Sequence, residues 1–364
     1  MQSNSPKMMH RFSYIATACL TLFLTPYREQ PTFAEIAPPV ILHPLQSTAP
    51  LPLTEGLRAI VQLQDLDLPH PQTTGEETIP LRALTGTRVF VLDLHIGDSH
   101  SETLGDRTAT FLFDIGASTS MLSTPTVKDL GLQGKALPQE LLTSAVAGDE
   151  CETMNANLHT FPPLTRDSLR IEGLQGLEFT DVIIPGRLDG VLGMDVLGHY
   201  DLEVDPRQRM LTLLPPGSNP ELNLEAEVPL VERLGVLLVQ VEINGEGPFT
   251  FLIDNGADRM FISQGLAELL NLGEEDRSPI QIQGFCGLEP AQATVLRQVK
   301  LEQHEQQDLD AIILASPVLK LLEVDGILGQ NFLNEYQQYW RFDREERAGK
   351  LQGGRLLLIP YPSR

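Results

Sequence analysis

Two aspartates, Asp114 and Asp254, stand in matching surroundings, one in each half of a repeated sequence. Each follows a β-type run, residues 110–113 or 250–253, and each is followed two residues later by a glycine. Such a run predicts a strand that delivers its aspartate to the strand end. The glycine permits backbone conformations closed to other residues, so the chain can turn sharply around the carboxylate. Two carboxylates presented in this way are candidates for general acid and general base catalysis.

The two aspartates belong to a longer duplication. The block Asp189-Gly190-Val191-Leu192-Gly193 recurs as Asp325-Gly326-Ile327-Leu328-Gly329, at nearly the offset that separates the two aspartates. Residues 202–207 and 340–345 form a third pair, because both predict a strand that runs into a turn. Motifs that recur in one order at nearly one offset indicate a duplicated unit. An Asp-x-Gly tripeptide alone is a common turn, so the prediction depends on the ordered and duplicated blocks.

These blocks resemble the aspartic proteases, in particular the retropepsin-like branch, in which alanine follows Asp-x-Gly. The Asp-x-Gly-Ala loops and the later Asp-Gly-[Val/Ile]-Leu-Gly strands resemble that family's catalytic loop and its supporting strand. Retroviral members carry one copy and dimerise, so this chain is similar to a fused pseudo-dimer over roughly residues 79–360. The resemblance implies a mainly β fold, with two similar lobes in a pseudo-two-fold arrangement and a cleft between them.

The resemblance also implies roles for single residues. The catalytic pair maps onto Asp114 and Asp254. The residues that would support the two loops are Gly116, Ala117, Gly256 and Ala257. Candidate substrate contacts are Ser118 and Asp258 in the loops, and Gly148 and Phe285 where the family places its substrate-covering hairpins. For Ser118 and Asp258, turn residues satisfied by their own loop are an equal alternative. For Gly148, a plain surface hairpin is the alternative.

One position departs from the family pattern. The residue directly after the aspartate is normally Thr or Ser, whose hydroxyls bridge the two loops beneath the catalytic pair. Here this residue is Ile115 in one copy and Asn255 in the other. An isoleucine side chain cannot hydrogen-bond, whereas an asparagine can both donate and accept. Two functions therefore stay open: an aspartic endopeptidase, and a catalytically silent, protease-shaped protein that binds peptides.

The resemblance implies a definite chemistry for the enzyme. Two carboxylates at close range cannot both ionise readily, so one keeps a proton; the aspartic proteases themselves are the usual illustration of this effect. The ionised carboxylate takes a proton from a water molecule held between the pair, and the protonated one polarises the scissile carbonyl. No cofactor and no metal are expected. The sequence has no Gly-x-Ser-x-Gly or His-Glu-x-x-His motif and no phosphate-binding glycine loop.

Composition limits the partners. The chain has 41% hydrophobic and 21% charged residues, as soluble globular proteins have. Its 49 acidic residues exceed its 26 basic residues, for a formal net charge of −23. Such a surface repels phosphate backbones, so nucleic acid is not an expected partner. The expected partner is a polypeptide substrate, and the internal pseudo-dimer predicts a monomer.

The first residues resemble an export signal. Lys7 and Arg11 precede an apolar run at residues 14–24, and Thr32-Phe33-Ala34 offers small residues for cleavage. The run is shorter than the roughly 20 apolar residues of a membrane span. We therefore expect residues 1–34 to be a signal peptide, with an uncleaved membrane anchor as the alternative. Either implies an exported protein.

The domain boundaries follow composition. Residues 35–78 are rich in proline and predict a linker or loosely attached arm; an inhibitory pro-segment would carry more basic residues than the single Arg58. The first lobe is predicted at residues 79–214, a linker at 215–227 and the second lobe at 228–364. Cys151 and Cys286 occupy similar places in the two repeats, and we favour two thiols over a cross-link between the lobes.

Short strands separated by Gly, Asn and Pro favour an all-β lobe. The clearest predicted strands cover residues 89–96 and 236–243, and a turn is predicted at 244–247. A short helix is predicted just after each aspartate loop, at residues 126–132 and 265–272.

Overall fold

The structure is a computed structural model. It describes residues 53–54, 60–63, 68–97, 107–138, 143–146, 155–181, 184–218, 227–284, 287–315, 319–320, 322–345 and 350–362. The chain divides into two compact units, Met1–Thr48 and Ala49–Arg364, and every described residue belongs to the second. The predicted signal peptide, Gly148, Phe285 and the cysteines Cys151 and Cys286 lie outside the described residues. Within the described ranges, no helix has both the length and the apolar character needed to cross a membrane.

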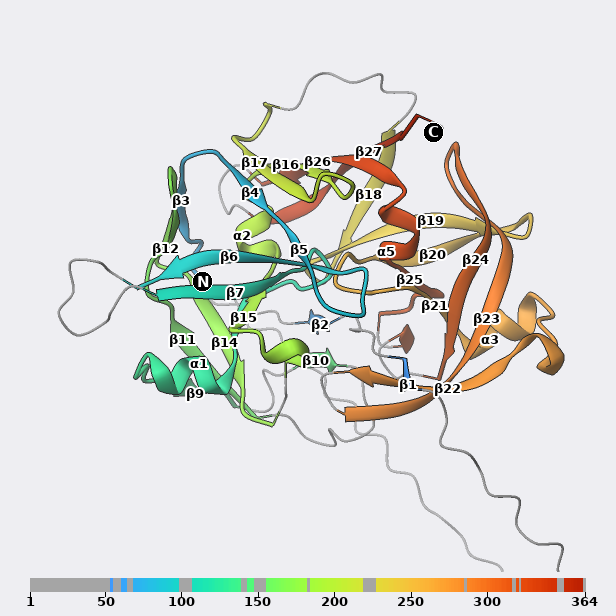
Figure 1. Ribbon diagram of the computed structural model, residues 1–364, viewed down its shortest axis with the longest axis horizontal. Coiled ribbons are helices and arrows are strands. Elements are labelled where there is room, and N and C mark those ends of the chain that lie inside the picture. The colour runs from blue at the N-terminus through green and yellow to red at the C-terminus, as the bar shows by residue number, and fades with distance from the viewer. Residues whose placement is uncertain are drawn as a thin grey trace, which may run out of the picture. The chain divides into compact units, whose positions relative to one another are not determined.

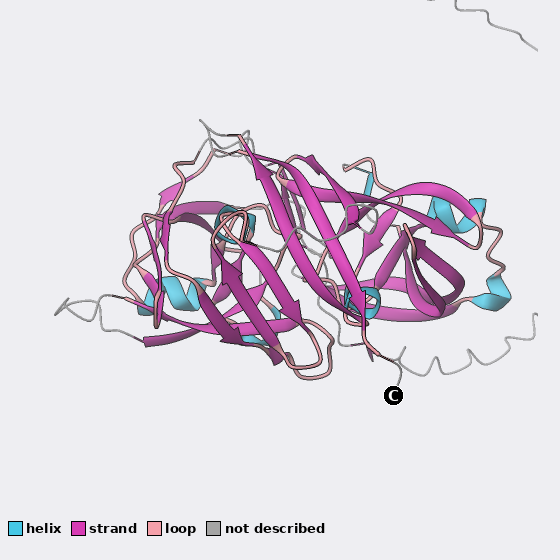
Figure 2. Cartoon of the chain, turned by 90° about the horizontal axis from the view of Figure 1, so that it is seen from above, coloured by secondary structure: helices cyan, strands magenta, loops and turns pink. Residues whose placement is uncertain are grey.

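Strands dominate both halves of the second unit (Figures 1 and 2). The segment before the first lobe and the first lobe itself contain β1 (Leu53–Thr54), β2 (Ile60–Leu63), β3 (Gln72–Thr74), β4 (Glu77–Pro80), β5 (Arg82–Ala83), β6 (Phe90–Ile96), β7 (Arg107–Phe113), β8 (Met121–Leu122), α1 (Thr124–Asp129), β9 (Lys135–Ala136), β10 (Thr143–Val146), β11 (Ala156–Thr160), β12 (Leu164–Arg166), β13 (Leu169–Glu172), β14 (Gln175–Phe179), the 3-10 helix η2 (Pro185–Arg187), β15 (Gly190–Leu192), α2 (Met194–Leu197), β16 (Asp201–Asp205) and β17 (Met210–Leu214).

The second lobe repeats this order. It contains β18 (Glu227–Arg233), β19 (Val236–Ile243), β20 (Glu246–Ile253), β21 (Met260–Ser263), α3 (Gln264–Leu269), the 3-10 helix η4 (Glu274–Asp276), β22 (Ser278–Gly284), β23 (Gly287–Leu301), β24 (His304–Leu314), β25 (Gly326–Leu328), α5 (Gln330–Leu333), β26 (Tyr336–Arg344) and β27 (Leu351–Pro360).

The two lobes share one strand order around their aspartates. In the first lobe the order is β6-β7-β15-β8-β14-β11, and in the second it is β19-β20-β25-β21-β24-β23. β15 pairs in parallel with β7, and β25 pairs in parallel with β20 in the equivalent register. The duplication read from the sequence is therefore a duplication of structure, and the prediction of a mainly β fold with two similar lobes is confirmed.

The lobes join through strands that are each other's repeat equivalents. β16 pairs antiparallel with β26, and Glu203 lies opposite Tyr339, which follows Glu203 at the offset that separates Asp189 from Asp325. An antiparallel pair of equivalent strands places a pseudo-two-fold axis at its centre. Buried apolar residues of both lobes, from Phe111 and Leu202 to Phe251 and Trp340, form one continuous core beneath this junction.

Serine caps fix where the two short helices begin. We predicted helices at residues 126–132 and 265–272, but α1 and α3 begin and end earlier. Ser123 Oγ accepts a hydrogen bond from the backbone N–H of Thr126, and Ser263 Oγ accepts one from Leu266. A serine in this position satisfies a free backbone donor of the first turn and so starts the helix.

The proline-rich stretch before the first lobe, which we predicted to be a linker or loosely attached arm, contains short strands. β1, β2 and β3 lie within it, and β4 begins there at Glu77. β3 extends the sheet of the first lobe beside β13, and β4 lies beside β17. These strands are short and lie at sheet edges. Proline is tolerated in edge strands because its missing N–H is not needed there for pairing.

Candidate active site

The duplicated loops bring Asp114 and Asp254 together at the junction of the lobes. The backbone N–H of Asp114 donates to the carbonyl of Leu192 (3.2 Å), and that of Asp254 donates to Leu328 (3.0 Å). β15 and β25 therefore hold the two loops in the same way. Both aspartate side chains are fully buried, with no exposed surface.

Two glycines make this approach possible. A Cβ atom on Gly116 would lie 2.3 Å from Cγ of Asp254, and one on Gly256 would lie 2.6 Å from Oδ2 of Asp114. Each carboxyl group thus occupies the space that a side chain would fill on the opposite loop. Any residue with a Cβ at these positions must displace the other lobe's aspartate. The glycine of Asp-x-Gly is required here for close approach between the lobes.

Backbone donors hold one oxygen of each carboxyl group. Asp114 Oδ1 accepts from the N–H of Ala117 (3.1 Å), and Asp254 Oδ1 accepts from the N–H of Gly256 (2.7 Å). The Oδ2 atoms accept no hydrogen bond from an N–H or O–H group of the described residues. The two carboxyl groups influence each other's protonation, because each lies against the glycine of the opposite loop.

Burial shifts the protonation of this pair. Burial, together with the charge of Asp254, raises the pKa of Asp114 well above its ordinary value. Burial also raises the pKa of Asp254, to about 6, against the opposing effect of the Gly256 and Ala257 N–H groups and of Asp114. Close carboxyl groups titrate as a unit. Near neutral pH the pair therefore keeps a proton that two isolated aspartates would lose.

Asn255 bridges the two loops beneath the pair. Its Oδ1 accepts a hydrogen bond from the N–H of Ile115 (2.5 Å), and its Nδ2 donates to the carbonyl of Phe113 (3.0 Å). The carbonyl of Asn255 itself accepts from Gln330 Nε2 (3.0 Å). Ile115 contributes its backbone to the bridge and buries its side chain in the core. One asparagine thus makes two hydrogen bonds to the opposite loop, and the partner position needs no hydroxyl.

We expect Asn255→Ala to destabilise the protein by about 1–3 kcal/mol, because it leaves the buried Ile115 N–H and Phe113 carbonyl without partners. Thermal or denaturant unfolding measures this cost. Ile115→Val is the matched control on the opposite loop, since it keeps both hydrogen bonds and removes only one methyl group, at about 0.5–1.5 kcal/mol. A free energy of unfolding in Asn255→Ala equal to that of the wild type would show that the asparagine bridge contributes nothing.

Gly190 and Gly326, the first glycines of the two Asp-Gly-x-Leu-Gly motifs, allow β15 and β25 to pack closely on the strands that carry the aspartates. A Cβ atom on Gly190 would lie 2.8 Å from the ring of Phe111, and one on Gly326 would lie 2.3 Å from the ring of Phe251. The phenylalanine three residues before each aspartate therefore packs on the glycine of the neighbouring strand. The two duplicated motifs are one packing unit, with the aromatic ring of one lying on the glycine of the other.

Ser118 and Asp258 lie where each loop meets the opposite lobe. Asp258 is buried, and its carboxylate accepts from the backbone N–H of Arg88 and from Nε of Arg259 (3.2 Å). The Arg88 guanidinium lies 3.7 Å from the same carboxylate, and the Arg88 carbonyl accepts from Asn334 (3.0 Å). Ser118 packs against Gly235, where an added Cβ would lie 2.8 Å from Ser118 Cβ. Both residues therefore contact the partner lobe, and the described contacts of Asp258 tie the two lobes together.

A second layer of polar contacts lies under the loops, and the sequence motifs alone did not identify it. Asp195 accepts hydrogen bonds from the N–H (2.8 Å) and Oγ (2.6 Å) of Ser120, and Asn331 accepts one from the N–H of Met260 (2.8 Å). Burial raises the pKa of Asp195 to about 6. Asp195 and Asn331 occupy equivalent positions, because each stands at the same place after the Asp-Gly-x-Leu-Gly block of its own repeat. That equivalence was the signal that could have identified them.

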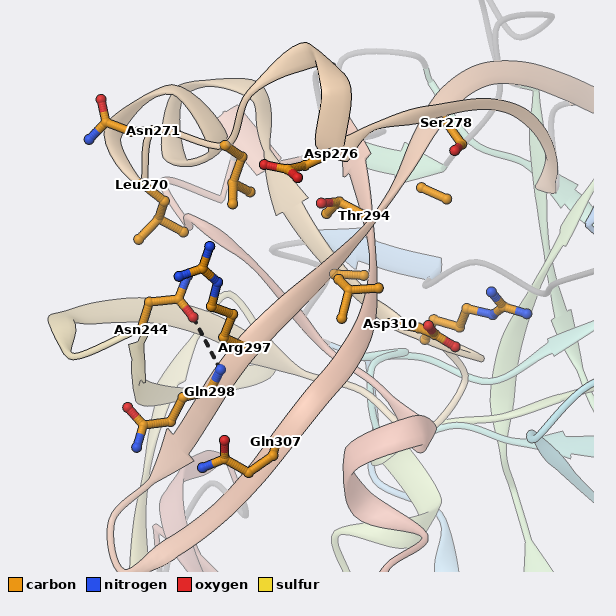
Figure 3. Close-up of a pocket in the computed structure, with 15 residues that line it drawn as sticks. Asn244, Leu270, Asn271, Asp276, Ser278, Thr294, Arg297, Gln298, Gln307 and Asp310 are labelled. Atoms are coloured by element: carbon orange, nitrogen blue, oxygen red, sulfur yellow. Dashed lines mark hydrogen bonds between the residues drawn. The ribbon is translucent and has the colours of Figure 1, made fainter.

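Two hollows adjoin the loops. One, of about 480 Å³, lies at the lobe junction and is bordered by Ser118, Asp195 and Gly235. The other, of about 780 Å³, lies in the second lobe between the α3–η4 segment and the β23–β24 hairpin (Figure 3). Arg259, which follows the second loop and binds Asp258, lines this second hollow together with Thr294.

Two β lobes with equal Asp-x-Gly-Ala loops, meeting at a buried aspartate pair across a pseudo-two-fold axis, define the aspartic-protease class of fold. Family models agree with this class for each lobe. Residues 102–196 match a model described as "Aspartyl protease", and residues 239–335 match one described as "gag-polyprotein putative aspartyl protease". Each match contains one aspartate loop and its supporting strand. Two aspartyl protease domains, one in each lobe, therefore support a place for the chain in the retropepsin-like aspartic protease family.

No curated protein matches the chain. Among solved structures, basic 7S globulin from soybean is 11% identical with a TM-score of 0.40, over 77% of this chain and 95% of that one. A retropepsin-like aspartic protease from Rickettsia conorii is 16% identical with a TM-score of 0.27, over 36% of this chain and 92% of that one. At such identities a likeness extends no further than the fold.

Proposed function

We propose that the chain is an aspartic endopeptidase, which hydrolyses peptide bonds with a water molecule activated between Asp114 and Asp254. The observation that carries the proposal is the aspartate pair itself. Each carboxyl group is buried, lies against the glycine of the opposite loop, and keeps one oxygen that accepts no hydrogen bond from the described residues. A pair that served only to hold the lobes together would gain nothing from two groups that repel each other once both are ionised.

The chemistry follows from the shared proton. With one carboxyl group ionised and one protonated, the ionised group takes a proton from water while the protonated group hydrogen-bonds to the scissile carbonyl oxygen. Water attacks the carbonyl carbon, the tetrahedral intermediate collapses, and a proton passes to the departing amine. Asp114 and Asp254 are not assigned separate roles, because the pair titrates as a unit. The substrate class that suits this mechanism is a polypeptide in extended form.

The alternative function, a catalytically silent protein that binds peptides, was motivated by Ile115 and Asn255. Asn255 forms two hydrogen bonds to the opposite loop, so this departure from the family pattern leaves the loops bridged. The absence of Thr or Ser at these two positions therefore no longer argues for a silent protein. Export, a monomeric state and the absence of a nucleic-acid partner stay predictions from the sequence alone.

A digestion experiment tests the proposal. Protein without residues 1–34 is incubated with unfolded proteins, and the products are read by mass spectrometry. We expect internal cleavage that a statine peptide, which mimics the tetrahedral intermediate, blocks competitively. Binding of the statine peptide and of substrate peptides with no cleavage at any pH would instead establish the silent binding protein.

A further inference from the structure

The second lobe has a hollow at a place that the first lobe fills with a histidine. This hollow, of about 780 Å³, lies between the α3–η4 segment and the β23–β24 hairpin (Figure 3). Its volume is within the roughly 300–1,000 Å³ that is usual for small-molecule sites. The described residues that line it include neither Asp114 nor Asp254. The hollow is therefore a feature of the second lobe that the aspartate pair does not explain.

The strand registers identify Thr294, which lines the hollow, as the counterpart of His159 in the first repeat. β14 pairs in parallel with β8, and β24 pairs in parallel with β21 in the equivalent register. One residue before this pairing, β14 has Gly176, which lies opposite His159. At the same place β24 has Ala311, which lies opposite Thr294.

In the first lobe, the ring of His159 fills the space beside the segment that follows the short helix. The side chain is buried, and its Nε2 lies 2.9 Å from Oε2 of Glu178. A Cβ atom on Gly134, in the segment after α1, would overlap the ring. The second repeat has the smaller Thr294 in place of the ring and Ile313 in place of Glu178. The hollow lies where this ring and its carboxylate partner are missing.

Thr294 leaves a polar group at the wall of the hollow. It is 5% exposed, and its hydroxyl makes no hydrogen bond with the described residues. Buried polar groups are nearly always hydrogen-bonded, so a ligand in the hollow would supply the partner that this hydroxyl needs.

Arg277 fixes the neighbouring wall. Its Nη2 donates to the carbonyl of Leu272 (2.7 Å), and its Nη1 donates to Oε1 of Gln292 (3.3 Å). Leu272 lies between α3 and η4, and Gln292 lies in β23. These hydrogen bonds tie the two sides of the hollow together, as is usual for a site that is formed before its ligand binds.

The hollow presents charged groups of both signs. Arg297 of β23, Asp276 of η4 and Asp310 of β24 line it (Figure 3). Their side chains make no hydrogen bond or ion pair with another described residue. Arg259, the fourth charged residue of the described lining, already donates to Asp258 (3.2 Å). A ligand that pairs with the other three side chains must carry both an anionic and a cationic group.

We propose that this hollow is a second binding site of the chain, and that it takes a short peptide by its two charged ends. Arg297 binds the terminal carboxylate, because a guanidinium offers paired donors that match a carboxylate. Asp276 and Asp310 bind the terminal ammonium group, and the hydroxyl of Thr294 bonds to the main chain of the peptide. A free peptide with uncharged side chains is neutral as a whole, as are the two acidic and two basic residues of the described lining taken together.

Calorimetric titration of the full chain with trialanine tests the site. We expect trialanine to bind, and to bind about tenfold more weakly when its amino end is acetylated or its carboxyl end is amidated. Each blocked end loses a charge-assisted hydrogen bond. The absence of trialanine binding, or equal affinity for all three peptides, overturns the proposal. The site is not that of the aspartate pair, so a failure of the digestion experiment would leave the proposal standing.

Arg297→Gln locates the bound peptide. This variant should bind trialanine about tenfold more weakly than the wild type, because it removes the partner of the carboxylate. Lys300→Gln is the matched control, since it makes the same change of charge on the same strand. Lys300 pairs with Glu242 (3.0 Å) and is not among the described residues that line the hollow, so the control should bind as the wild type does. Equal affinity in Arg297→Gln and the wild type would place the peptide elsewhere and overturn the proposal.

Two substitutions of Thr294 test the wall of the hollow. Thr294→His gives the second lobe the residue that fills the first, so it should abolish trialanine binding. Thr294→Val keeps the shape of the side chain and removes only the hydroxyl, so it should weaken binding about threefold to tenfold and fold even where the histidine variant does not. Wild-type affinity in both variants would contradict a peptide bound against Thr294.

Discussion

Asp114→Asn and Asp254→Asn should each lower the rate of peptide cleavage by about 10²–10⁴-fold, since either substitution removes one half of a single acid–base unit. Asparagine has nearly the shape of aspartate but can neither take a proton from water nor share one with its partner. The values of kcat/KM for a peptide substrate measure this loss. Full activity in either variant would contradict the shared-pair mechanism.

The same variants should be more stable than the wild type at neutral and higher pH. Burial raises the pKa of both carboxyl groups in the folded protein. Their contribution to stability is therefore present at low pH and is lost as the pH rises through the raised pKa values. Asparagine carries no charge at any pH and avoids this loss. Unfolding temperatures are measured at acidic and at slightly alkaline pH. An inactive variant that is less stable than the wild type at both pH values would have lost activity through a folding defect, not through loss of the acid–base pair.

Gly116→Ala and Gly256→Ala should each slow cleavage by about 10²-fold and destabilise the fold. The new Cβ would lie 2.3 Å from Cγ of Asp254 in the first case and 2.6 Å from Oδ2 of Asp114 in the second. Overpacking of this kind costs about 1–3 kcal/mol. The aspartate side chain is short, so relieving the contact moves the carboxyl group away from its partner. A displacement of about 1 Å at reacting groups can cost about 10²-fold in rate.

Gly265→Ala is the matched control for these substitutions. Gly265 lies in α3, shortly after the second loop, and the nearest atom to an added Cβ is Ser263 Oγ at 4.0 Å. Alanine favours a helix by about 1 kcal/mol over glycine, so this variant should be as stable as the wild type or more stable, and fully active. Wild-type activity in Gly116→Ala would show that the two carboxyl groups need not be as close as they are here.

The sequence predicted those parts of the site that depend on residues close together in the chain. An apolar strand, an aspartate at its end and a glycine two residues later determine the loop at Asp114 and again at Asp254 without reference to the rest of the chain. The repeat then required the two copies to be arranged alike, so the second lobe followed from the first. Strand β19 was predicted with its observed bounds for the same reason, since a long apolar alternation needs no distant partner.

What the sequence did not predict depends on contacts between distant segments. The roles of Asn255 and Ile115 are decided by the backbone of the other lobe's loop, which comes within reach of Asn255 only in the folded chain. The buried Asp195 depends on Ser120, and the paired state of β1 and β2 depends on edges offered by β22 and β10. Composition alone described the proline-rich stretch as a linker because such short strands leave almost no pattern to read.

The most direct test of the aspartate pair is the dependence of kcat/KM on pH, measured on the wild-type chain from about pH 3 to about pH 9. A pair that works with one proton gives a bell-shaped profile, and both limbs should lie above the range of ordinary carboxyl groups because burial raises both pKa values. We predict such a bell, absent in Asp114→Asn and Asp254→Asn. A profile with a single limb, or cleavage that either asparagine variant retains, would contradict a mechanism in which the two aspartates share one proton.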